Sequence, residues 1–229
     1  MPGSAMSWQD TLHGKRDEAQ RLENMETFKH IKAVVWDVGG VIVRTVDPSP
    51  RSKLSAELGV TLEKLNTLFF SGPEGVQAQK GAISVGKLVA SVRQHLGLKP
   101  GEFPDLMERF FGGDQVDYEL VAFIRSLKPR YKTGIISNAW RNLPRMLETW
   151  GIRDAFDMVI SSGDEGIMKP DPQIFQLALA RLSVRADETV FIDDFIENVE
   201  AARNLGFQAI HFRNREQALI ELGSILNDE

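Results

Sequence analysis

The sequence contains no cysteine among its 229 residues. A disulfide framework, a thiolate metal site and a cysteine nucleophile are therefore excluded, and this composition fits the cytoplasm. No apolar run approaches the length that spans a bilayer, and the amino-terminal region lacks the apolar centre of a signal peptide. The net charge is −5 and the basic residues are scattered, which argues against a nucleic-acid-binding surface. We expect a cytoplasmic chain with neither a membrane nor a nucleic-acid partner.

The four histidines also lack any spacing typical of metal ligands. What is present is the composition of a globular protein, with 42% hydrophobic and 26% charged residues. A chain of this length can bury one sizeable core, or a core and a smaller second domain. The sequence leaves the oligomeric state open.

The stretch at residues 33–43 is the strongest local signal. An apolar run stops at Asp37, turns at Gly39 and Gly40, and then resumes. The β-branched residues before Asp37 predict a buried strand, and the glycines allow a tight turn and the close approach of a ligand. Asp37 is therefore expected at the carboxyl end of a strand, where open α/β sheets bind ligands. The alternative is that Asp37 only caps a turn.

Strand-like and helical patterns alternate through the second half of the chain. The strand-like runs lie at residues 33–37, 131–136, 156–161, 189–192 and 207–212. This alternation predicts an α/β fold with a doubly wound, parallel, five-stranded Rossmann-like sheet.

The region between the first two of these strands has a different pattern. Residues 44–51 are polar with two prolines and predict a linker, whereas residues 52–111 are helical throughout, with Thr61 and Ser84 placed as N-caps. We predict three parts: a charged amino-terminal arm at residues 1–27, an α/β core at 28–44 and 114–229, and an inserted helical domain at 45–113.

Polar residues follow the predicted strands at four places: Asp37, Ser137-Asn138, Lys169 and Asp193-Asp194. Because parallel strands end at one edge of a sheet, we expect these residues to converge. Clustered carboxylates repel one another, and a divalent cation removes that cost; oxygen ligands suit Mg²⁺. A lysine and a hydroxyl beside backbone amides suit a phosphoryl group. An aspartate in line with phosphorus can act as a nucleophile.

Each of these residues also has a plainer interpretation. Asp194 at this position would serve as a helix N-cap, Lys169 as a solvated lysine before proline, and Ser137 as a turn residue. Asn138 fits the N-cap of the following helix as well as a phosphate site. Trp140, two residues later, either packs in the interior or lines a substrate pocket.

Four short motifs together resemble the haloacid dehalogenase (HAD) superfamily. They are residues 36–41 (Trp-Asp-Val-Gly-Gly-Val), 135–138 (Ile-Ile-Ser-Asn), 169–172 (Lys-Pro-Asp-Pro) and 190–194 (Val-Phe-Ile-Asp-Asp). The helical insert is similar to the C1 cap of that family. The chain most resembles the subgroup with glucose-1-phosphate phosphatases and the N-terminal phosphatase domain of epoxide hydrolase. The resemblance implies a phosphohydrolase with a small phosphorylated metabolite as its substrate.

The resemblance also implies how the phosphate would be handled. Asp37 would be the nucleophile and would form an aspartyl phosphate. Ser137 and the amide of Asn138 would bind the phosphoryl oxygens. Lys169 would neutralise both the nucleophile and the phosphate.

A Mg²⁺ site is implied by the same resemblance. Its ligands would be Asp37, the backbone carbonyl of Gly39 and Asp194. Asp193 and Asn198 would support this site from behind the ligands.

The sequence departs from the family pattern at Gly39. Most phosphatases of the family carry there a second aspartate, which protonates the leaving group, and such catalysis contributes about 10²–10⁴-fold. Its absence favours substrates with good leaving groups, or a proton delivered by water or by the substrate itself.

Two other functions remain open at this stage. A HAD dehalogenase also uses an aspartate nucleophile but no metal, and the Asp193-Asp194 pair argues against it. A non-catalytic regulatory or scaffold protein on the same fold is supported only by Gly39.

Overall fold

The computed structural model describes residues 30–227. The predicted charged arm at residues 1–27 lies outside this range. Within the described range, no helix combines the length and the apolarity that crossing a membrane requires.

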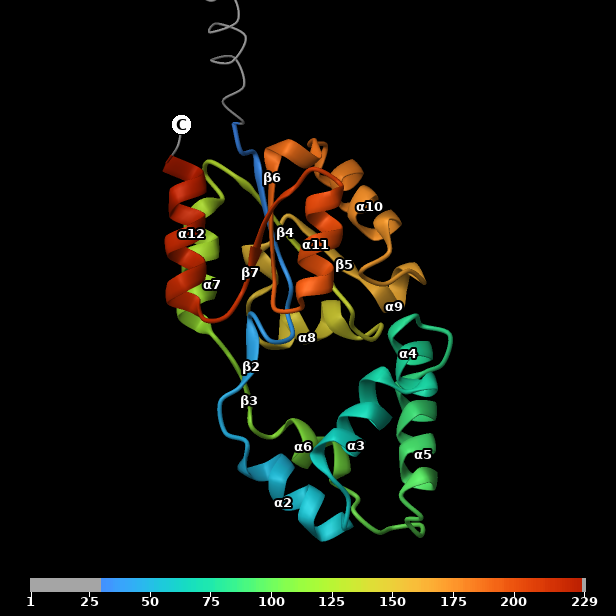
Figure 1. Cartoon of the computed structure of the whole chain (residues 1–229). Coiled ribbons are helices and arrows are strands. Elements are labelled where there is room, and N and C mark those ends of the chain that lie inside the picture. Colours follow the sequence, from blue (N-terminus) through green and yellow to red (C-terminus); the bar gives the residue numbers. More distant parts are fainter. Residues whose placement is uncertain (1–29, 228–229) are drawn as a thin grey trace, which may run out of the picture.

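The described chain contains a parallel five-stranded sheet, as the sequence predicts (Figure 1). The strand order is β5-β4-β1-β6-β7, so the first strand lies at the centre. In register, Trp36 of β1 pairs with Ile135 on one side and Ile192 on the other. The five strands are β1 (Ala33–Trp36), β4 (Lys132–Ser137), β5 (Met158–Ser161), β6 (Thr189–Asp193) and β7 (Gln208–His211).

Apolar side chains of β1 alternate between two cores, because successive strand residues point to opposite faces. Val34 and Trp36 belong to the first core, Ala33 and Val35 to the second. Helices α7 (Tyr118–Leu127), α8 (Leu143–Thr149) and α12 (Arg215–Asn227) contribute to the first core. Helices α10 (Pro172–Leu182) and α11 (Ile196–Asn204) cover the other face. The sheet is therefore covered by helices on both faces.

The predicted helical insert lies beyond the carboxyl edge of the sheet (Figure 1). Its helices pack around their own apolar cluster, which includes Leu54, Phe69 and Phe110. Thr61 and Ser84 cap their helices through the side-chain oxygen, as predicted. The elements are α2 (Ser49–Leu58), α3 (Leu62–Asn66), a π-helical turn η1 (Thr67–Ser71), α4 (Pro73–Gln79), α5 (Val85–His95) and α6 (Leu106–Phe111).

The predicted linker at residues 44–51 is wrong. Strands β2 (Val43–Thr45) and β3 (Asp114–Val116) pair antiparallel where the chain enters and leaves the insert, and α2 already begins at Ser49. Arg44 pairs with Asp117, which also bonds Arg215 of α12. The polar residues of this segment are therefore engaged in ordered pairing. The exact limits of the inserted domain stay a prediction.

Short elements also replace some predicted loops. The turn-rich segment after β5 forms α9 (Ser162–Glu165), and two 3₁₀ turns, η2 (Arg153–Ala155) and η3 (Ala186–Glu188), precede β5 and β6. The strand predicted from residue 156 starts two residues later, at Met158.

Candidate active site

Asp37 lies one residue beyond β1, at the carboxyl edge of the sheet. Its backbone N–H donates to the carbonyl of Ile192 at 2.9 Å, which extends the pairing with β6 to this position. Its carboxylate accepts hydrogen bonds from the backbone N–H of Val38 at 2.6 Å and from the side chain of Ser137. The carboxylate is thus fixed by the turn that follows β1 and by the end of β4.

Lys169 is a fully buried cation between two carboxylates. Its Nζ lies 3.0 Å from Oδ1 of Asp37 and 2.6 Å from Oδ2 of Asp193. Asp193 also accepts from Nδ2 of Asn198 and from the backbone N–H of Phe195. Since Asp193 is fully buried, these contacts hold it and Lys169 in one arrangement, with Asn198 behind them.

The backbone of Lys169 is tied to the loop after β4. Nδ2 of Asn138 donates to the Lys169 carbonyl at 2.9 Å, and the Lys169 N–H donates to Oδ1 of Asn138 at 2.8 Å. The N-cap of α8 is Asn142, so the alternative of Asn138 as a helix cap is wrong. Asn138 instead joins two of the four sequence motifs.

Asp194 differs from Asp193 because one of its carboxylate oxygens accepts no hydrogen bond from the described part of the chain. This oxygen, Oδ1, is also buried. The N-cap of α11 is Phe195, so Asp194 does not cap this helix. The carbonyl of Asp194 is bonded by Nε2 of His211 at 3.0 Å. The sequence offered no spacing signal for that histidine.

Gly40 makes the approach of Asp194 to the first loop possible. Its φ of +78° favours glycine, and a Cβ at this position would lie 2.0 Å from Oδ2 of Asp194. Gly39 is different, because no heavy atom outside its chain neighbours in residues 30–227 lies within 4 Å of a Cβ built there. The missing general acid therefore leaves open space.

The carboxylates strongly affect one another. Burial, opposed by the nearby Lys169 and reinforced by Asp193, raises the pKa of Asp37 to about 6. Burial and the charges of Asp37 and Asp193 raise the pKa of Asp194 to about 7. Burial lowers the pKa of Lys169, but the two carboxylates beside it outweigh this effect and raise its pKa. One ammonium does not compensate three carboxylates.

A divalent cation fits this edge of the sheet. One carboxylate oxygen each from Asp37, Asp193 and Asp194 lie within 4.8 Å of one another. Both oxygens of Asp193 accept hydrogen bonds from Asn198, besides those from Lys169 and the Phe195 N–H, so Asp37 and the unpartnered oxygen of Asp194 are the better placed ligands. Hard oxygen donors in this number suit Mg²⁺, which keeps several waters.

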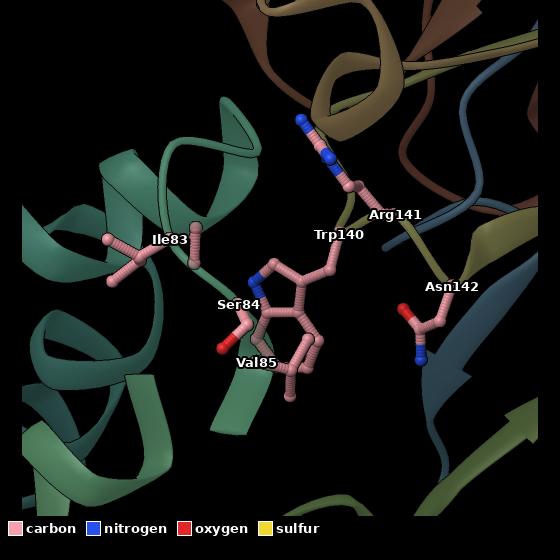
Figure 2. A pocket seen from close by; sticks show the side chains of 7 residues that line it. Ile83, Ser84, Val85, Trp140, Arg141 and Asn142 are labelled. Atoms are coloured by element: carbon pink, nitrogen blue, oxygen red, sulfur yellow. The ribbon is translucent and has the colours of Figure 1, made fainter. Parts of the chain in front are cut away.

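The helical insert contacts the core beside this site. Ser162 Oγ of α9 donates to the carbonyl of Gln79 at 2.6 Å. Trp140 enters the aromatic cluster of the insert, with its ring 6.2 Å from Phe70 and 5.8 Å from Phe111. Trp140 therefore packs against the insert and also lines a hollow between the insert and the core (Figure 2), so its two interpretations are compatible.

Comparison with known proteins supports the motif assignment. A family model described as haloacid dehalogenase-like hydrolase matches residues 31–206. A sesquiterpene phosphatase of Aspergillus oryzae is 27% identical over 200 residues, covering 85% of this chain and 96% of the relative. A D-ribitol-5-phosphate phosphatase of Bacteroides thetaiotaomicron is 28% identical over 216 residues, covering 86% and 99%.

The expected likeness to epoxide hydrolase is also found. The bifunctional epoxide hydrolase 2 of Sus scrofa is 25% identical over 214 residues, but the chain spans only 39% of its length. Among solved structures, a HAD-family enzyme of B. thetaiotaomicron in complex with magnesium and inorganic phosphate has a TM-score of 0.68 at 20% identity, covering 82% of this chain and 98% of that one. This structural likeness shows a shared fold.

Proposed function

The chain belongs to the haloacid dehalogenase-like hydrolases, and from this premise we propose that it is a Mg²⁺-dependent phosphohydrolase of a small phosphorylated metabolite. The observation that carries the proposal is the buried contact of Lys169 with Asp37 and Asp193, beside the unpartnered oxygen of Asp194. A buried cation next to a carboxylate at the end of a strand is suited to receive a phosphoryl group. The relatives named as phosphatases support the same reaction class.

In the proposed reaction, an oxygen of the Asp37 carboxylate attacks phosphorus. The bond from phosphorus to the ester oxygen breaks, and that oxygen leaves with the electron pair. Ser137 and the amide of Asn138 hold the phosphoryl oxygens, and Lys169 lowers the repulsion between Asp37 and the phosphate. Water then attacks the aspartyl phosphate, releasing inorganic phosphate and restoring the carboxylate.

Asp37, Asp194 and the carbonyl of Gly39 are the proposed Mg²⁺ ligands. When bound, Mg²⁺ supplies positive charge to the phosphate and to the carboxylates. Asp193 does not need to be a ligand, because it holds Lys169 in place and is itself held by Asn198. Both residues therefore support the site from behind.

Hydrolysis of p-nitrophenyl phosphate and acetyl phosphate tests the proposal, with Mg²⁺ or with EDTA. We expect phosphate release that requires Mg²⁺ and falls at least about a thousandfold in Asp37→Asn. The matched control is Asp164→Asn, which removes an exposed carboxylate of α9 and is expected to retain activity. Folded protein that hydrolyses no phosphate would refute the proposal, and EDTA-insensitive chloride release from a 2-haloacid would favour the dehalogenase alternative.

A further inference from the structure

A hollow of about 280 Å³ lies between the insert and the core loop that follows the phosphate-binding motif. The insert contributes four lining residues from the end of α4 to the start of α5, and the core contributes three from the loop after β4. Figure 2 shows Trp140 reaching from the core toward Ser84 and Val85 of the insert. The lining residues are Ala78, Ile83, Ser84, Val85, Trp140, Arg141 and Asn142.

The hollow is close to the proposed phosphate site along the chain. Trp140 follows Asn138 by two residues, so their Cα atoms are at most about 7 Å apart. Asn138 is tied to the backbone of Lys169. A phosphate held by Ser137, Asn138 and Lys169 would therefore have its ester group within reach of the hollow.

Its walls are mainly apolar, and the indole N–H of Trp140 has no hydrogen-bond partner within the described part of the chain. Nε of Arg141 donates to the carbonyl of Gly163 at 2.9 Å, and Oγ of Ser84 accepts from the backbone N–H of Lys87 at 3.2 Å. A group with many hydroxyls would meet mostly apolar surface there, and each hydroxyl left unpaired costs about 1–3 kcal/mol. An apolar group loses no hydrogen bonds on entering.

The size of the hollow indicates the size of that group. An apolar cavity of about 150 Å³ accepts benzene, and this hollow is larger. A two-ring aromatic body is therefore of suitable volume, and the indole of Trp140 offers it an aromatic neighbour.

The open space at Gly39 adds an independent constraint on the leaving oxygen. With no side chain at position 39 to donate a proton, the site favours a departing oxygen that is stable as an anion. A phenol ionises near pH 10, as tyrosine does, whereas an alkoxide is comparable to hydroxide, whose parent water has a pKa of about 15.7. Aryl phosphates meet this preference, whereas polyol phosphates need a proton from water or from the substrate itself.

We propose that the substrates are aryl phosphates, the phosphate monoesters of an apolar phenol, whose ring occupies the hollow between Trp140 and Val85. The inference rests on the proposed phosphohydrolase function. In the reaction the phosphorus–oxygen bond breaks, the phenolate leaves with the electron pair, and it takes its proton from solvent. No further reactant is needed besides water.

Substrate comparison with the full chain and Mg²⁺ provides the first test. We expect kcat/KM for 1-naphthyl phosphate to exceed that for phenyl phosphate at least tenfold, and that for ribitol 5-phosphate at least a hundredfold. A preference for ribitol 5-phosphate, or equal values for the two aryl esters, would overturn the inference while leaving the phosphohydrolase intact. Failure to hydrolyse even p-nitrophenyl phosphate would overturn both.

A pair of variants tests the location. Val85→Asp places a charge in the hollow, at the first residue of α5, where acidic residues are tolerated by the helix. Gly86→Asp adds the same charge one residue later, at an exposed position outside the lining. We expect Val85→Asp to raise KM for 1-naphthyl phosphate at least tenfold and for phenyl phosphate less than threefold, with Gly86→Asp unchanged. Equal effects of the two variants would refute the location.

Discussion

Two adjacent glycines after β1 have opposite requirements. A side chain at Gly40 would collide with the Asp194 carboxylate, whereas the space around Gly39 is open. Gly40 is therefore required by packing, and Gly39 is not. The residue at position 39 is instead a matter of chemistry.

Gly39→Asp is expected to restore a general acid without disturbing the fold. The variant should raise kcat for ribitol 5-phosphate at least tenfold, since such catalysis typically contributes about 10²–10⁴-fold. The gain for p-nitrophenyl phosphate should be much smaller, because its leaving group needs no proton. Gly39→Asn, which has the same shape and no acidic proton, is the control. Equal gains for both substrates would contradict this explanation.

The contact between insert and core depends on the loop that follows α4. Ser162 of α9 bonds the carbonyl of Gln79. Gly81, with φ +65°, would place a Cβ only 2.0 Å from the carbonyl of Gly163. The insert therefore contacts the core through α9 at the backbone and through the aromatic ring of Trp140 in the loop after β4.

Gly81→Ala is expected to displace the insert from the core. Gly97 provides a matched control, because its φ is +66° and no atom of the described chain outside its neighbours lies within 4 Å of a Cβ there. Both variants should lose about 1–2 kcal/mol through backbone strain. Only Gly81→Ala should also lower kcat/KM at least fivefold and shift tryptophan fluorescence to longer wavelength.

Adding Trp140→Phe to the Gly81→Ala variant tests whether Trp140 is the source of the fluorescence shift. The fluorescence shift should disappear, because Trp140 packs against the aromatic cluster of the insert. A shift of the same size in Gly97→Ala, or one that persists without Trp140, would show that seating on α9 is not its cause.

The central strands and the residues at their ends could be predicted, because their signals lie in residues that are adjacent in sequence. The β-branched runs before Asp37 and Asp193 identified central strands, and the rule that parallel strands end at one edge brought Lys169 to both carboxylates. The pairing of β2 with β3 was missed because it joins three-residue segments about seventy positions apart. Such short strands have no periodicity of their own.

The relation of Trp140 to the insert escaped prediction for a similar reason. Its sequence neighbours fit both a buried ring and a pocket wall. Its aromatic contacts are with Phe70 and Phe111, which come from helices of a different part of the chain. The different environments of Asp193 and Asp194 were implied by the family resemblance, and their contacts now provide the physical reason.

The carboxylate cluster also makes the stability of the whole molecule depend on pH and on metal. The pKa values of Asp37, about 6, and Asp194, about 7, exceed the ordinary value of 3.8 in the folded protein. Between about pH 4 and 7 the folded chain therefore binds more protons at these groups than the unfolded chain does. Their contribution to the free energy of unfolding consequently falls as pH rises through this window.

Asp194→Asn is expected to remove much of this penalty. Without Mg²⁺, its Tm should exceed that of the parent chain by a few degrees at pH 8 and match it near pH 4, since 1 kcal/mol shifts Tm by about 2–4 °C in a chain of this size. Added Mg²⁺ binds the ionised cluster of the folded state and should raise the parent Tm more at pH 8 than at pH 5. In Asp194→Asn the Mg²⁺-induced rise should be lost, whereas Asp164→Asn should keep it. Thermal unfolding scans with EDTA or Mg²⁺ at these pH values provide the measurement. If metal-free Asp194→Asn instead has a lower Tm than the parent chain at pH 8, the Asp194 carboxylate stabilises the fold. That result would contradict a metal ligand whose charge destabilises the metal-free protein.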